Sequence, residues 1–323
     1  PHINKFDNYV EVKTINNIAH LYKIDEVVLY IIADFKFAPI WLIQQWYEDF
    51  DCNGYLVVEN WIKVGIVWAE PSAMGVFIRP TKFLLDMMSI DNQNYIQIPF
   101  GLLNHTCAEE QIIFDVMTGN IKSEFWNFIK DEEDKLPCYH PLKINVPNES
   151  GTLVIREEMF KLNLFDRKAL EAKQDSLKRS INDKKKFTDE FNDFSLFPII
   201  SYTSDNKIIT QKPDVIIPIP RVDGNAKSYS IELELSSKTP DKYKTIMNNY
   251  KNNLTFGKLC YVCGNPRIMR LVTEAYKAVG GLGSCRLFVI PFKSPAQRLS
   301  NFNIDDENAQ RTMLNLTVNN TKR

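Results

Sequence analysis

The sequence lacks long apolar runs and is poor in cysteine. Its longest apolar stretches, such as residues 27–33, are far shorter than the roughly 20 residues that a helix needs to cross a bilayer. No apolar segment of a secretory signal peptide follows residues 1–5. Six cysteines in 323 residues are too few for a disulfide-stapled scaffold. We therefore expect a protein of the reducing cytoplasm that does not contact membranes.

A zinc-binding cysteine pattern is lacking as well. Cys260 and Cys263 form one C-x-x-C motif, but the motif lies within an apolar run. No second pair of cysteine or histidine residues completes a set of four zinc ligands. We expect the cysteines to be buried structural thiols.

The chain also has almost no net charge, although its two halves differ strongly. The 39 Lys and Arg residues and the 40 Asp and Glu residues leave a net charge of −1, which argues against a wholly basic nucleic-acid binder. Residues 1–150 hold 11 basic and 21 acidic residues, whereas residues 151–323 hold 28 and 19. Because phosphate contacts need Lys and Arg, we expect DNA contact mainly in the second half.

The first ninety residues predict three short helices followed by a β-hairpin. Asp25 is a suitable N-cap, Pro39 suits the first turn of the next helix, and Gly65 suits a helix C-terminus. The expected elements are helices at 25–35, 39–50 and 55–64, strands at 66–69 and 76–79, and a further helix from Thr81 to Met88. This order is that of a winged helix, in which the third helix reads the DNA major groove and the hairpin is the wing.

The charge of this module leaves a second interpretation open. Residues 1–100 are acidic, and few side chains could donate to DNA. The candidates are Asn60, Lys63, Arg79 and Lys82. A winged helix of this kind can instead bind a protein partner or form a homodimer.

The middle of the chain offers weaker signals. Residues 103–117 predict a helix, in which His105 fits a cap or core position equally well. Residues 121–135 predict a polar helix, and residues 166–190 are rich in Lys. The Lys-rich stretch is either a solvated surface segment or an arm that follows phosphates.

The most informative block begins at Pro213-Asp214. A short strand follows, then the turn signal Asp223-Gly224-Asn225, and then a strand at 229–235 in which Glu232 and Glu234 share one face. The expected elements after it are a helix from Asp241, a strand at 258–263, a helix at 266–279 and a strand at 285–291. This order matches the core of the PD-(D/E)xK nuclease superfamily.

In that superfamily an Asp and an acidic residue on the next strand bind Mg²⁺, and a Lys two residues later polarises the attacking water. Here Asp214 and Glu232 supply the acids, but Glu234 occupies the Lys position. Lys238 lies further along on the same side. Asp214, Glu232 and Glu234 are therefore candidate Mg²⁺ ligands, with Lys238 as a displaced catalytic Lys if the site is active. Alternatively, the glutamates simply face solvent.

These motifs resemble those of the replication-relaxation family, whose members occur on plasmids and other mobile elements of bacteria. The resemblance rests on the winged-helix pattern, Leu103-Asn104-His105-Thr106-Cys107, Pro213-Asp214, Ile231-Glu232-Leu233-Glu234, Thr239 and Tyr250. The family typically has Leu-Glu-x-Asp followed by a Thr, so it too carries an acid where nucleases have Lys. The resemblance spans about residues 25–292. It implies a nuclease-like fold used for DNA binding without robust cleavage. In that arrangement the helix at 103–117 would be the first helix of the nuclease-like core, and Glu109 or Glu110 could point toward the metal face.

We therefore expect an α/β protein with an α+β N-terminal module. The expected domains are a winged helix at 1–90, a nuclease-like mixed sheet flanked by helices at 91–297 with a Lys-rich insertion near 138–195, and a polar tail at 298–323. Lys242, Lys244 and Lys251 would hold the backbone of double-stranded DNA. The expected function is that of a DNA-binding accessory protein in replication, mobilisation or transfer. The alternatives are a Mg²⁺-dependent endonuclease and a scaffold that docks a protein partner through its acidic module.

Overall fold

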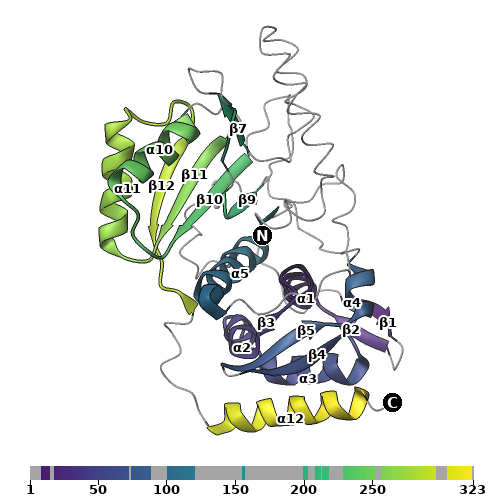
Figure 1. Cartoon of the computed structure of the whole chain (residues 1–323). Coiled ribbons are helices and arrows are strands. Elements are labelled where there is room, and N and C mark those ends of the chain that lie inside the picture. The colour runs from purple at the N-terminus through teal and green to yellow at the C-terminus, as the bar shows by residue number, and fades with distance from the viewer. Residues whose placement is uncertain are drawn as a thin grey trace. The chain divides into compact units, whose positions relative to one another are not determined.

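The computed structural model is a mixed α/β structure of helices and small sheets (Figure 1). It describes residues 9–14, 18–72, 74–88, 100–120, 155–156, 199–202, 208–211, 213–217, 228–251, 256–295 and 304–321. The expected helix at 121–135, the Lys-rich stretch at 166–190 and the turn at 223–225 lie outside these residues. The chain divides into two compact units, unit 1 (residues 1–151 and 293–323) and unit 2 (residues 152–292).

Unit 1 begins with the hairpin β1 (Val10–Lys13) and β2 (Ile18–Leu21). The elements that follow are α1 (Lys23–Phe35), β3 (Ala38–Pro39), α2 (Ile40–Glu48), α3 (Gly54–Val64), β4 (Val67–Ser72), β5 (Gly75–Pro80), α4 (Lys82–Met87), the 3₁₀ turn η1 (Phe100–Leu102), α5 (Leu103–Thr118) and α12 (Ile304–Thr321). Strands β3, β5 and β4 form an antiparallel sheet in that order. The three helices and the hairpin thus occur in the predicted order.

Local sequence signals account for the ends of these helices. The Asn53 side chain accepts hydrogen bonds from the first amides of α3, and Gly65 ends that helix with φ 83°. A φ in this left-handed region favours glycine. Thr81 caps α4 by accepting a bond from the Leu84 amide. The sequence predicted Gly65 and Thr81 at these helix ends, because caps act within one turn. Helix α1, however, begins at Lys23, so Asp25 lies in its first turn and is not the N-cap that the sequence predicted.

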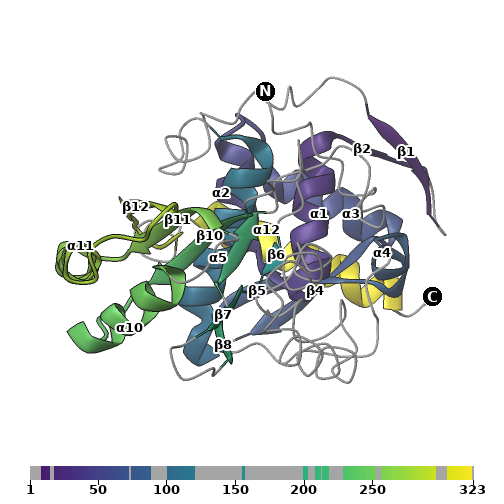
Figure 2. The same cartoon turned by 90° about the horizontal axis from the view of Figure 1, so that it is seen from above.

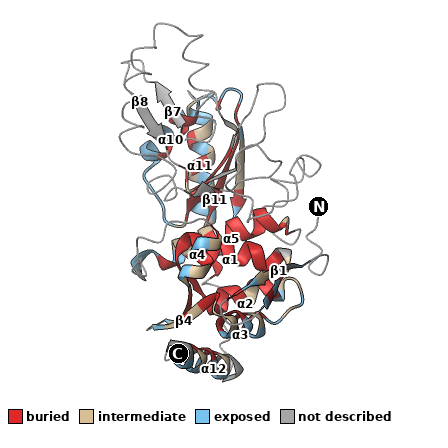
Figure 3. Cartoon of the chain, turned by 90° about the vertical axis from the view of Figure 1, so that its right-hand side faces the viewer, coloured by how far each residue is buried: buried red, intermediate tan, exposed pale blue. Residues whose placement is uncertain are grey.

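The core of unit 1 lies among its helices, with α1, α2 and α5 largely buried (Figure 3). The Trp46 and Phe114 rings stack 5.0 Å apart, which joins α2 to α5. The Trp46 Nε1 group donates a 3.0 Å hydrogen bond to Gln111 Oε1, so its polar atom is satisfied inside the core. Helix α5 therefore belongs to the same core as the first three helices.

The C-terminal helix α12 packs against α3, β4 and β5 (Figure 1). The Ala69 amide of the edge strand β4 donates a 2.9 Å hydrogen bond to Thr317 Oγ1. Met313 is fully buried, and the two polar residues Gln310 and Thr317 are also buried. Where the sequence suggested only a polar tail, residues 304–321 form a helix that covers the edge of a sheet.

Unit 2 is built on a five-stranded sheet in the order β12–β11–β10–β9–β6, of which Figure 2 labels β12, β11 and β10 next to one another. Its strands are β6 (Ile155–Arg156), β9 (Val215–Ile217), β10 (Ser228–Glu234), β11 (Phe256–Cys263) and β12 (Arg286–Pro291). Strand β9 is antiparallel to β6 and β10, whereas β10, β11 and β12 are parallel. A separate hairpin joins β7 (Ile199–Tyr202) to β8 (Ile208–Gln211).

Two helices cross over between the parallel strands, α10 (Pro240–Lys251) and α11 (Pro266–Ala278). Both bury their apolar stripes against one face of the sheet. On β11 this face carries Leu259, Tyr261 and Cys263, because alternate residues of a strand point to the same side. The opposite face carries the intervening residues.

The cysteines are mostly buried, as the sequence predicted. Among the described residues, Cys107, Cys260, Cys263 and Cys285 are buried, and Cys52 is half-buried. Burial raises the pKa of the Cys263 thiol to about 12, and the charge of Glu234 adds to this effect. In the described part of the chain, no helix has the length and apolar character required to span a membrane.

Candidate functional site

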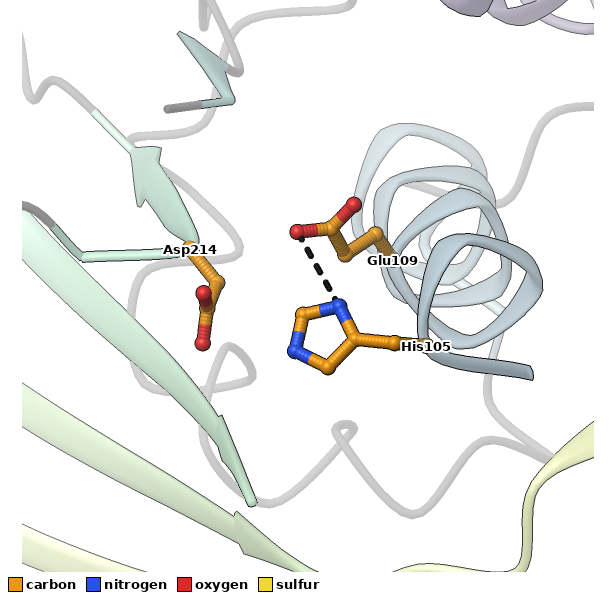
Figure 4. A group of neighbouring side chains, drawn as sticks. All are labelled: His105, Glu109 and Asp214. Atoms are coloured by element: carbon orange, nitrogen blue, oxygen red, sulfur yellow. Dashed lines mark ion pairs between the residues drawn. The ribbon is translucent and has the colours of Figure 1, made fainter. Parts of the chain in front are cut away.

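The predicted acidic residues lie on two neighbouring strands of unit 2. Asp214 directly precedes β9 (Figure 4), and Glu232 and Glu234 lie on β10. The Leu233 amide donates a 2.6 Å hydrogen bond to Asp214 Oδ2. This bond holds the Asp214 carboxylate against β10, next to the two glutamates.

Both glutamates are buried rather than facing solvent. Glu232 is 8% exposed and Glu234 is 4% exposed. The Tyr250 hydroxyl of α10 donates a 2.5 Å hydrogen bond to Glu232 Oε1. Burial raises the pKa of Tyr250 well above its ordinary value, and the charge of Glu232 raises it further. The hydroxyl therefore stays protonated and acts as a donor.

Glu234 is engaged by Lys238, which lies between β10 and α10. The Lys238 ammonium donates to Glu234 Oε2, and the Lys238 amide donates a 3.1 Å bond to the Tyr243 hydroxyl. Burial lowers the pKa of Lys238, but the bond to Glu234 and the charges of Glu234, Glu232 and Asp214 outweigh it, so the pKa is raised overall. The four predicted catalytic residues thus form one electrostatically coupled cluster.

A fifth polar residue of this cluster is Tyr261. It lies opposite Glu232 in the parallel register of β10 and β11. Burial raises the pKa of Tyr261 well above its ordinary value, and the charges of Glu232, Glu234 and Asp214 add to the effect. Within the described residues, neither its hydroxyl nor that of the buried Ser230 has a hydrogen-bond partner. Sequence reasoning missed Tyr261 because an aromatic residue in an apolar strand is typical of a core.

Carboxylate oxygens are the ligands that Mg²⁺ prefers, so Asp214, Glu232 and Glu234 are the side chains of unit 2 that could hold it. In the described part of the chain, however, the ligand atoms of these three do not all lie within 4.8 Å of one another. Each carboxylate accepts a hydrogen bond from a protein donor instead. Binding one metal ion by all three carboxylates would require at least one of these side chains to move closer to the others.

Two further candidates lie on α5. The His105 Nδ1 atom lies 3.5 Å from Glu109 Oε1, and the two residues are one helical turn apart (Figure 4). Glu110 is fully buried, so it points to another side of the helix than the partly exposed Glu109. This ion pair gives His105 a role at the helix surface rather than in the core.

The predicted DNA-contacting residues of unit 1 have different environments. Asn60, Lys63 and Lys82 are exposed, and Lys63 forms an ion pair of 3.6 Å with Glu59. Arg79, by contrast, is only 2% exposed.

Arg79 is held inside unit 1 by several contacts. Its Nε atom lies 2.5 Å from Glu70 Oε2, and its Nη1 atom donates a 3.1 Å bond to the Lys36 carbonyl. Its guanidinium carbon lies 5.6 Å from the centre of the Phe37 ring. Arg79 therefore stabilises the hairpin and is not available as a surface contact.

The three predicted lysines of α10 are all exposed. Lys244 forms an ion pair of 3.2 Å with Asp241. The Lys251 ammonium donates to the Val279 carbonyl near the C-terminus of α11, so this residue also links the two helices. Lys242 and Lys244 are thus the better candidates for a purely surface role.

Comparisons of the chain with protein-family models, with curated proteins and with solved structures find no match.

Proposed function

We propose that the chain is a DNA-binding accessory protein of a bacterial plasmid or other mobile element, acting in replication, mobilisation or transfer without strong nuclease activity. The resemblance of the motifs to the replication-relaxation family is what suggests the biological setting. Unit 1 and unit 2 each support the proposal through a different observation.

Unit 1 supports the proposal through its topology. The order α1, β3, α2, α3, β4, β5 and the sheet order β3–β5–β4 are those that a winged helix would have, which supports the proposal. Asn60 and Lys63 lie on the exposed side of α3, which would be the reading helix.

The observation that carries the proposal is that groups of the protein already donate hydrogen bonds to the acidic residues of unit 2. They lie on or directly before two neighbouring strands, as the acids of a PD-(D/E)xK domain would, yet Tyr250, Lys238 and the Leu233 amide already donate to them. These donors take up part of the hydrogen-bonding capacity of the carboxylates, and the Lys238 ammonium compensates part of their charge without a metal ion. A nuclease-like domain with this arrangement is better suited to holding DNA than to cutting it.

Salt-dependent binding tests the proposal. We expect full-length protein to bind duplex DNA with an affinity that falls steeply with salt, because Lys and Arg release counterions from phosphates. The double variant Lys242→Ala/Lys244→Ala should reduce the slope of log affinity against log salt by about 2 if each lysine contacts one phosphate. Lys277→Ala removes an exposed lysine from α11 and serves as the matched control. Unchanged affinity and slope in the double variant would contradict the assignment of this surface.

A second candidate function is a Mg²⁺-dependent endonuclease. The contact between Lys238 and Glu234, together with the charges of Glu232 and Asp214 around that lysine, favours it. Mg²⁺ held by the three acids would activate a water molecule for attack on a phosphodiester. In this alternative, Lys238 would orient that water and stabilise negative charge.

Plasmid nicking separates the two functions. Nicking by the wild-type protein with Mg²⁺ or Mn²⁺ that disappears in Asp214→Ala would establish the endonuclease. Equal nicking by both proteins would point to a contaminant, and absence of nicking at high protein concentration would exclude this candidate. DNA affinity measured on the same samples shows whether the binding function is present.

A further inference from the structure

A row of cations and aromatic rings crosses the sheet of unit 2 on the face opposite α10 and α11. Tyr229 of β10 lies in register with Lys258 of β11, and Lys258 lies in register with Arg286 of β12. Phe288 follows Arg286 by two residues and so shares its face. The row therefore stands near the amino ends of three parallel strands.

These residues are in mutual contact. The Lys258 ammonium lies 4.5 Å from the centre of the Tyr229 ring and 5.8 Å from that of Phe288. The Arg286 guanidinium carbon lies 4.8 Å from the centre of the Phe288 ring. A cation at such a distance from a ring is attracted by the electrons of the ring face. The rings thus hold two positive charges in fixed positions.

Arg286 has the properties of a residue that contacts a ligand. It is exposed, and it forms no ion pair with any part of the chain that the structure describes. A guanidinium group resting on an aromatic ring keeps its N–H donors in the plane of the group, where they match the oxygens of a phosphate. By contrast, Arg270 on the surface of α11 lies 3.8 Å from Glu274.

The acidic cluster does not oppose an anion at this position. Ser230, Glu232 and Glu234 point to the other face of β10, because side chains alternate along a strand. Glu232 and Glu234 also lie at the carboxyl end of β10, whereas Tyr229 lies at its amino end. The sheet therefore separates its positive and negative charges by both face and end.

We propose that Arg286 and Lys258, held by Phe288 and Tyr229, form a contact site for the phosphate backbone of DNA. The proposal rests on the DNA-binding function above and identifies a surface for it that is distinct from the lysines of α10. Arg286 makes the direct contact. Lys258 is 8% exposed, so it acts by adding positive potential beside Arg286.

The test compares full-length variants by fluorescence anisotropy with a labelled DNA duplex over a series of salt concentrations. We expect Arg286→Gln to weaken binding about tenfold, the effect of losing one charge-assisted contact, and to lower the salt slope by about 1. Arg286→Lys keeps the charge and should retain most of the slope. Arg270→Gln is the matched control on α11 and should bind like the wild type.

Two outcomes would overturn the proposal. If the wild type binds DNA and Arg286→Gln binds with the same affinity and slope, the contact site is wrong while the DNA-binding function stands. If no protein in the series, including the wild type, binds DNA, the proposed function is wrong together with this site.

Discussion

The Tyr250 hydroxyl of α10 donates a hydrogen bond to the buried Glu232 carboxylate of β10. Glu232 is thereby tied to the helix that covers its face of the sheet. A buried carboxylate is costly unless donors compensate for its lost hydration. The same bond therefore serves the stability of unit 2 and limits the availability of the candidate metal ligand.

Removing this donor should destabilise unit 2. We expect Tyr250→Phe to lower the free energy of unfolding by about 1–3 kcal/mol, the usual cost of depriving a buried acceptor of its partner. Chemical denaturation followed by circular dichroism measures the change. Tyr276→Phe, at a partly exposed position of α11, is the control and should have little effect. A Tyr250→Phe protein as stable as the wild type would contradict the importance of this bond.

The stability of unit 1 should depend on pH through Asp25. Burial raises the pKa of this carboxyl from 3.8 to about 6, against the opposing effects of bonds from the Tyr47 hydroxyl and the Tyr22 amide. Between these two values the folded state holds a proton that the unfolded state has lost, so stability falls as pH rises from about 4 to about 6. The full loss is about 3 kcal/mol.

Tryptophan fluorescence can follow this effect in unit 1, because all five tryptophans lie between residues 41 and 126. The Asp25→Asn variant has no carboxyl at this position, so its stability should change less between pH 4 and pH 7. An identical pH profile in wild type and Asp25→Asn would show that another group is responsible.

Arg79 should affect stability and not DNA affinity. Arg79→Ala removes the ion pair with the partly exposed Glu70 and a donor to the Lys36 carbonyl, so we expect destabilisation of about 1–3 kcal/mol. Lys82→Ala is the control, since Lys82 is exposed nearby. Thermal unfolding measures the difference. Folded Arg79→Ala protein that loses DNA affinity with unchanged stability would restore Arg79 as a contact residue.

The packing of α12 against β4 can be tested at the hydrogen bond between the Ala69 amide and Thr317. Thr317→Val keeps the shape of the side chain but removes the acceptor, so the Ala69 amide should exchange with solvent faster and unit 1 should lose about 1 kcal/mol. Thr312→Val is the matched control, because Thr312 is exposed on the same helix. Hydrogen exchange read by NMR gives the rate for this amide. Equal rates in both variants would mean that α12 does not protect β4.

Helices and strands whose pattern depends on residues close together along the chain could be predicted from the sequence. The apolar spacing of α1, the Asn53 and Thr81 caps and the glycine after α3 act within a turn or two, so the sequence revealed the order of elements. The alternation of Glu232 with apolar neighbours likewise predicted a strand with an acidic face. The role of residues 304–321 was not predictable, because two of the buried side chains of α12 are polar and give no apolar stripe.

By itself, the sequence determined the order of the helices and hairpin between residues 23 and 87, the order of elements from β9 to β12, and the position of the acidic motif within them. Only the tertiary structure decided that Arg79 is enclosed, that Tyr250 and Lys238 engage the glutamates, and that Arg286 rests on Phe288. The reason is physical. Helical and strand patterns arise from neighbours along the chain, whereas the partner of a buried polar group can lie far away, as Thr317 does from Ala69.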